Sequence, residues 1–172
     1  MDAAAVIDDF SAPFPRAATG TDWEMVSDRV MGGVSSGRLD PLEAGERRGM
    51  RLRGEVSLEN NGGFVQAALD LELGERSVNA AGWTGIALLV RGNGEHYNLH
   101  LLTADIRRPW ESYRASFVAG GDWTEVRLPF AEFERHRTEA RFDPGRLRRI
   151  GLVAIGRAFE ADLSVAELRF FA

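Results

Sequence analysis

Near the beginning of the chain, residues 22–37 place an aromatic, several acids and a glycine pair at short, fixed spacing. The Gly32-Gly33 pair tolerates positive φ angles and close backbone approach, so we expect a sharp turn there. Such a turn presents Asp28, Arg29 and Met31 in a defined geometry. Two interpretations stay open. These side chains contact a partner, or they shape a corner between two strands in which Asp28 accepts hydrogen bonds from backbone amides.

A second candidate site is a polar row in a predicted strand. His96, Asn98 and His100 alternate with apolar residues, so they share one face of the strand while the apolar residues face the core. At about 3.3 Å per residue, the Cα atoms of the two histidines lie about 13 Å apart, which is too far for both to bind one metal ion. The row is either the solvated side of a sheet or the floor of a shallow groove that hydrogen-bonds a sugar or a peptide.

Two further residues would extend this row. Arg114 joins it if the strand expected over residues 112–118 pairs beside the row, and Trp110 then lies at the lip. The indole of Trp110 is equally compatible with core packing and with an exposed anchor for a protein partner, because tryptophan is common in both places.

Acidic residues raise the question of glycoside hydrolysis, which needs two carboxylates about 5–10 Å apart. Glu55 and Glu59 share a predicted strand face, where a spacing of four residues separates them by about 13 Å. The tripeptide Gly92-Asn93-Gly94 begins like a dinucleotide-binding fingerprint but continues without a third glycine or a helix. The sequence therefore predicts a non-catalytic protein without a cofactor or a metal ion.

The composition indicates one domain over residues 1–172, because a chain of this length with 44% hydrophobic residues buries about 70% of its unfolded surface. A net charge of −5 argues against nucleic acid as a partner, since such binding needs a clustered basic surface. No stretch approaches the roughly 20 apolar residues that span a bilayer. The acidic amino terminus lacks the basic region of a secretory signal. We therefore expect a cytoplasmic protein without a membrane span.

Period-two alternation and glycine turns predict an all-β protein. We expect one hairpin from residues 50–59 and 64–69, and a second from residues 86–90 and 97–101, the first arm of which is central because it is apolar on both faces. Further strands are expected at 112–118, 123–128, 150–155 and 163–171, with Pro129 ending the second of these and a register change near residues 165–166. Residues 130–136 suggest one short helical turn. Many short strands without helices favour a β-sandwich.

Several of these segments resemble the signature of the complex I intermediate-associated protein 30 family. The resemblance rests on residues 22–37 and 54–64, and continues in 85–92, around Trp123, and in 150–152. It implies a β-sandwich of the galactose-binding type, with jelly-roll topology. It also implies a non-catalytic role, in which the protein assists the assembly of respiratory complex I and its partner is a protein, such as a subunit of that complex.

The resemblance carries the family's motif over to ten residues of this chain. These are Asp28, Arg29, Met31, Gly32, Gly33, Ser35, Asn60, Asn61, Gly62 and Gly63. A carbohydrate-binding module, with a glycan held in the groove beside His100 and Trp110, is the alternative.

Overall fold

The computed structural model describes residues 4–43, 45–72 and 76–172, which form strands and short 3-10 helices. The strands are β1 (Val6–Asp8), β2 (Glu24–Ser27), β3 (Ser36–Pro41), β4 (Met50–Val56), β5 (Phe64–Asp70), β6 (Gly85–Gly92), β7 (His96–Thr103), β8 (Ser112–Val118), β9 (Thr124–Pro129), β10 (Glu134–His136), β11 (Leu147–Ile155) and β12 (Phe159–Phe171). The helices are η1 (Asp28–Met31), η2 (Glu59–Asn61), η3 (Phe130–Glu132) and η4 (Pro144–Arg146). Among these residues, no helix is long and apolar enough to cross a membrane.

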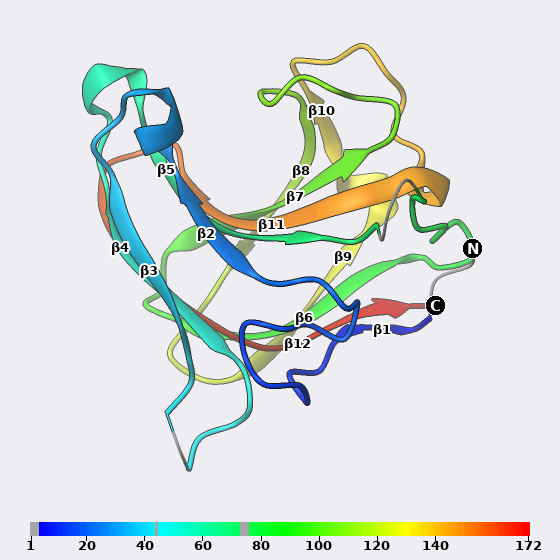
Figure 1. The fold of residues 1–172 in the computed structure, drawn as a ribbon, viewed down its shortest axis with the longest axis horizontal. Coiled ribbons are helices and arrows are strands. Elements are labelled where there is room, and N and C mark those ends of the chain that lie inside the picture. The colour runs from blue at the N-terminus through cyan, green and yellow to red at the C-terminus, as the bar shows by residue number, and fades with distance from the viewer. Residues whose placement is uncertain (1–3, 44, 73–75) are drawn as a thin grey trace.

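The strands form two antiparallel sheets that pack face to face (Figure 1). The first sheet has the order β3-β4-β12-β6-β9, with β1 also paired to β12. The second sheet has the order β10-β8-β7-β11-β5-β2. This arrangement is the predicted all-β sandwich.

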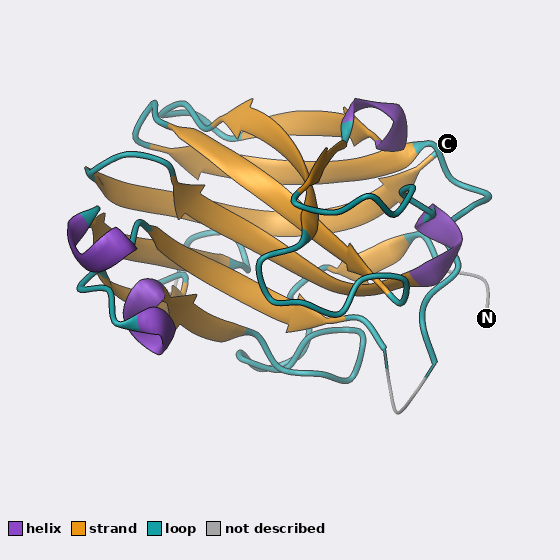
Figure 2. Cartoon of the chain, turned by 90° about the horizontal axis from the view of Figure 1, so that it is seen from above, coloured by secondary structure: helices purple, strands orange, loops and turns teal. Residues whose placement is uncertain are grey.

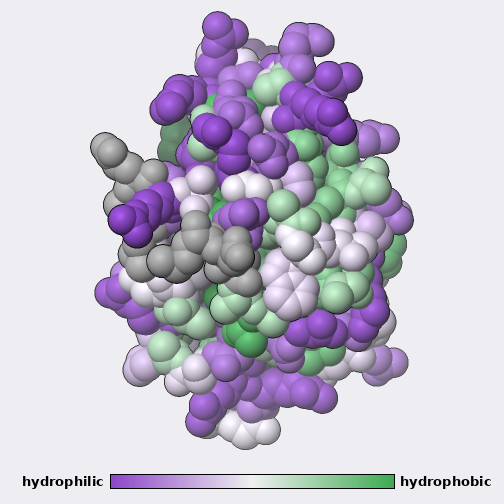
Figure 3. Space-filling model, turned by 90° about the vertical axis from the view of Figure 1, so that its right-hand side faces the viewer, coloured by the Kyte–Doolittle hydropathy of each residue, from purple (hydrophilic) through white to green (hydrophobic). Residues whose placement is uncertain are grey.

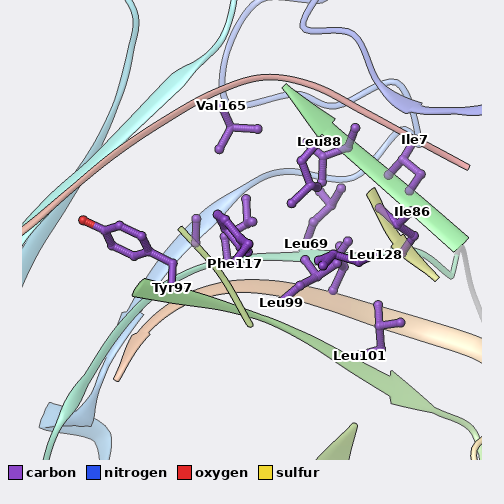
Figure 4. Close-up of a cluster of buried hydrophobic side chains, with 14 of the residues drawn as sticks. Ile7, Leu69, Ile86, Leu88, Tyr97, Leu99, Leu101, Phe117, Leu128 and Val165 are labelled. Atoms are coloured by element: carbon purple, nitrogen blue, oxygen red, sulfur yellow. The ribbon is translucent and has the colours of Figure 1, made fainter. Parts of the chain in front are cut away.

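Alternate residues of each strand point between the sheets and form the core (Figure 4). Leu88 and Val165 come from the first sheet, and Leu69 and Leu99 from the second; each is at most 1% exposed. Strand β6 lies inside the first sheet between β12 and β9, as its two apolar faces indicate. The core side of the polar row is also as predicted, since Tyr97 beside Leu99 is 1% exposed.

Both predicted hairpins are wrong. Strand β4 belongs to the first sheet and β5 to the second, and the same holds for β6 and β7. Each glycine turn therefore carries the chain across the core to the opposite layer. The alternation of apolar residues shows which face of a strand is buried. It does not show whether the next strand pairs beside it or joins the opposite sheet, because both arrangements bury one apolar face.

Two irregular points in the later strands agree with the sequence pattern. Strand β9 ends at Pro129, which has no amide to donate. The pairing of β12 with β6 shifts register between Val165 and Glu167, where the alternation slips. The helical turn expected over residues 130–136 is shorter than predicted, because η3 ends at Glu132 and strand β10 begins at Glu134.

Two of the tryptophans, Trp23 and Trp83, lie in or against the core. Trp23 is 3% exposed, and its indole N–H donates to the carboxylate of Asp8 at 2.7 Å. Trp83 packs half-buried against the core, and Trp123 lies half-buried under the guanidinium of Arg91, 4.8 Å from the ring centroid. Trp110 differs, since 52% of it is exposed.

Candidate functional site

The two glycine-containing segments meet at one end of the sandwich. Helix η1 follows β2 and η2 precedes β5, and Figure 2 shows the two helices side by side at the end of the sheets. Asp28, the first residue of η1, is 0% exposed. Its carboxylate accepts four hydrogen bonds, from the Ser35 amide (3.0 Å) and hydroxyl (2.5 Å) and from the amides of Gly63 (2.6 Å) and Phe64 (3.3 Å). We call residues 28–35 and 57–64 together the glycine corner.

The space around this carboxylate accounts for two of the glycines. A Cβ atom on Gly33 would lie 2.4 Å from Cγ of Asp28, and one on Gly62 would lie 2.5 Å from Oδ2 of Asp28. The Ser35 hydroxyl also accepts a hydrogen bond from the Ser57 amide at 2.8 Å. One buried carboxylate therefore joins two segments that are about 30 residues apart in the sequence, and it does so because glycine lets the backbone come close.

The hydrogen bonds determine the charge state of Asp28. Burial alone raises the pKa of this carboxyl, because it removes water from the charged form. The hydrogen bonds from Ser35, Gly63 and Phe64 favour that charged form and hold the pKa below its ordinary value. Asp28 is therefore an ionised structural group, and it is too enclosed to act as one of two carboxylates in a hydrolase.

The side chains of Arg29 and Asn60 also bond within the corner. Arg29 Nε donates to the Ser35 carbonyl at 2.8 Å, and the Asn60 amide donates to the Gly32 carbonyl at 3.3 Å. Asn60 and Asn61 adopt φ angles of 57° and 59°, and Gly32 and Gly63 adopt 90° and 140°. The positive φ of Gly32 agrees with the sharp turn expected at the Gly32-Gly33 pair, whereas Gly33 does not adopt one. The geometry favours the corner-shaping interpretation for these residues.

The corner exposes four apolar side chains to solvent beside its polar ones. Val30 is 77% exposed, Met31 58%, Leu58 51% and Val34 37%. Only Met31 is among the predicted site residues. The sequence pattern does not indicate the other three as site residues, because isolated apolar residues beside turns carry no periodic signal. Their position beside the buried Asp28 becomes visible only in three dimensions.

The second candidate site lies on the outer face of the second sheet. Strand β8 pairs with β7 as expected, placing Arg114 opposite His100 and Ser116 opposite Asn98. The Ser116 hydroxyl donates to the Asn98 side-chain carbonyl at 2.6 Å. His96 is exposed at the start of β7. The structure thus brings the predicted row together, and we call it the polar face.

The middle of the polar face is largely shielded from water. His100 is 8% exposed, and the outward Val153 and Ala68 of the adjacent strands are each 1% exposed. Gln66 covers Gly151, where an added Cβ would lie 2.6 Å from its Oε1 atom. Burial, helped by the positive charges of Arg114 and His136, lowers the pKa of His100 to about 3. The imidazole is therefore neutral near neutral pH and offers one donor and one acceptor.

Trp110 lies in the β7–β8 loop, two residues before β8 begins. It is half exposed, with the guanidinium of Arg108 5.9 Å from its ring centroid. The structure therefore places this indole at the surface rather than in the core. Glu55 and Glu59, by contrast, do not share a strand, because β4 ends at Val56 and Glu59 lies in η2.

Several solved structures of similar fold are carbohydrate-binding modules. The family 11 module from Clostridium thermocellum, in complex with a β-1,3-1,4-mixed-linked tetrasaccharide, is 13% identical with a TM-score of 0.75, covering 98% of this chain and 95% of that one. The family 11 module of the C. thermocellum cellulase Lic26A-Cel5E is 12% identical with a TM-score of 0.76, covering 100% and 96%. The family 30 module of C. thermocellum Cel9D-Cel44B is 14% identical with a TM-score of 0.58, covering 99% and 94%. At such identities the likeness concerns the fold.

Comparison with curated proteins gave no match. Residues 10–165 match the family described as Complex I intermediate-associated protein 30 (CIA30). The matched region includes both segments of the glycine corner and the whole of the polar face. By this match, the protein belongs to the complex I intermediate-associated protein 30 family.

Proposed function

We propose that this chain is a non-catalytic protein-binding module that assists the assembly of respiratory complex I, and that it contacts a subunit of that complex through the glycine corner. Membership of the family supports the assembly role. The observation that carries the choice of surface is the exposure of Val30, Met31 and Leu58 on a frame that the buried Asp28 holds.

The physical reason is that apolar side chains held in water favour a partner that covers them. Contiguous exposed apolar surface marks interaction sites in soluble proteins. Because Asp28 and its four hydrogen bonds hold the backbone of the corner, docking there orders few additional residues. Covering Val30 and Met31, which are 77% and 58% exposed, contributes roughly 2–4 kcal/mol to association.

Affinity capture from the source cell, followed by mass spectrometry, tests this proposal. We expect complex I subunits among the captured proteins, and at least a roughly tenfold loss of them with the double variant Val30→Ser, Met31→Ser. The matched control is Val118→Ser, which removes another exposed apolar side chain (48% exposed) from β8. Equal capture by both variants would contradict the choice of surface. Absence of complex I subunits from the unaltered protein would contradict the assembly role.

The polar face supports a second candidate function, carbohydrate binding. It combines amide, hydroxyl and imidazole groups at Asn98, Ser116 and His100 with an exposed aromatic ring at Trp110. Several solved structures of similar fold are carbohydrate-binding modules, one of them in complex with a tetrasaccharide. A thermal-shift screen with glycans tests this candidate, because a ligand that binds only the folded state raises the melting temperature. Loss of the shift in His100→Ala and Arg114→Ala variants would assign the glycan to this face.

A further inference from the structure

An arginine without an acidic partner lies at the β8 side of the polar face. Arg114 is half-buried, and its only hydrogen bond in the described part of the chain is from Nε to the Ser112 hydroxyl at 2.8 Å. Its neighbour across the strand pair is Glu134 of β10, but the two side chains form no ion pair. A guanidinium has five N–H donors. Four of those of Arg114 are therefore not used by any described residue.

Besides Glu134, two basic groups lie near Arg114. The pKa of Arg114 is lowered by burial and then by the charge of Arg137, which follows β10. Burial and the charges of Arg114 and Arg137 likewise lower the pKa of His136. These side chains repel one another, and no carboxylate contributes to either shift. A negatively charged group placed among them would relieve that repulsion and accept charge-assisted hydrogen bonds.

The surrounding loops make the same end of the molecule hydrophilic. In Figure 3, hydrophilic side chains gather at the top of the view, over the β7–β8 loop and the loop between β10 and η4. Arg107 and Arg141 of these loops also form no ion pair among the described residues, and Arg108 lies over Trp110. Arg146, by contrast, is already paired with Asp105 at 3.1 Å.

From this arrangement we infer that the polar face holds an acidic sugar, with the carboxylate or sulfate of the sugar bound by Arg114 and Arg137. The inference rests on the carbohydrate-binding candidate and specifies its ligand class. A saccharide fits this place better than a peptide strand does. Strand β7 lies between β8 and β11, so its backbone groups are already paired, and only side chains remain to bind a ligand.

The neighbouring side chains suit the rest of such a ligand. The buried neutral His100 lies directly opposite Arg114. Asn98 and Ser116 lie two residues further along the same two strands, as the next pair on the outer face. Hydroxyl groups of a sugar can donate to and accept from all three. Trp110, exposed at the start of β8, offers an aromatic surface near the same edge.

The test compares matched pairs of oligosaccharides that share length and linkage, one member built of hexuronates and the other of neutral hexoses. Binding is measured by isothermal titration calorimetry and by NMR of the arginine Nε–H signals. We expect a hexuronate to bind at least about tenfold more tightly than its neutral partner, as a charge-assisted bidentate contact predicts. Arg114→Gln and Arg137→Asn should each remove most of that difference. Arg137 has a φ of 56°, which asparagine tolerates.

The control variant is Arg149→Gln, which changes the net charge equally on the same sheet. Arg149 is already paired with Glu24 at 2.8 Å and Asp70 at 2.6 Å, so its loss should leave the preference intact. An equal loss in this control would indicate a general charge effect and overturn the site. Urea midpoints identify any variant that is unfolded, and Arg114→Lys, which keeps the charge, should then retain part of the preference.

The remaining outcomes separate this inference from the function on which it rests. Equal binding of the acidic and neutral sugars would overturn the anion site while supporting carbohydrate binding. Binding of neither sugar would overturn both. Tighter binding of a poly-glutamate peptide than of every hexuronate would overturn the assignment to a sugar.

Discussion

Replacing Asp28 by asparagine tests the central structural argument about the glycine corner. The substitution keeps the shape of the side chain but replaces one acceptor oxygen with an amide that can only donate. In the structure, Oδ1 accepts from the Ser35 amide and Oδ2 from the Ser35 hydroxyl and the amides of Gly63 and Phe64. Whichever way the new amide turns, it faces at least one backbone N–H that has no other acceptor.

The expected loss follows from these contacts. One unsatisfied buried donor costs about 1–3 kcal/mol, and each hydrogen bond that remains loses roughly 1 kcal/mol when its acceptor is no longer charged. With three hydrogen bonds remaining, the sum predicts that Asp28→Asn lowers the free energy of unfolding by roughly 4–6 kcal/mol. Urea denaturation followed by fluorescence of the four tryptophans measures this change.

Asp22→Asn is the matched control for that experiment. The Asp22 side chain is 52% exposed, and its one ion pair among the described residues is with Arg16 at 3.0 Å, so its loss should change the unfolding free energy by at most about 0.5 kcal/mol. If Asp28→Asn lowered the free energy of unfolding no more than this control does, the carboxylate would not be stabilising the glycine corner. The proposal that the corner is a rigid docking surface would then lose its physical basis.

Two further substitutions probe other parts of the fold. Burial and the charge of Arg114 lower the pKa of His100 to about 3, so the unfolded chain takes up a proton that the folded chain does not. Between about pH 7 and about pH 5, the free energy of unfolding of the wild type should therefore fall by about 2 kcal/mol more than that of His100→Asn. Identical losses by urea denaturation would refute the lowered pKa of His100. A Cβ on Gly54 would lie 2.2 Å from the Ser36 carbonyl oxygen. Gly54→Ala should therefore lower the melting temperature and the melting enthalpy measured by calorimetry, and the free energy of unfolding should fall by about 1–3 kcal/mol. Gly120→Ala, where a Cβ meets nothing within 4 Å, should be close to neutral; comparable losses in the two would contradict the steric argument.

The sequence by itself determined most of the strands and their buried faces, whereas β1, β2, β3 and β10 were not predicted. Alternation along a strand records which side chains leave water, and this signal is local. It placed Tyr97 and Leu99 inward and Asn98 and His100 outward, and the structure agrees. The Gly32-Gly33 pair likewise marked a turn with the positive φ angle of Gly32, because backbone sterics at a single residue decide such an angle.

Only the tertiary structure decided which strands are neighbours. The turn after β4 crosses to the opposite sheet instead of forming a hairpin, since burial is satisfied equally well across the core or along a sheet. The same long-range pairing brings Asp28 against Gly62 and Arg114 against His100, contacts between residues that carry no mutual signal in the sequence. The candidate sites depend on these contacts, because a hydrogen bond or a charge acts over a few ångströms of space rather than along the chain.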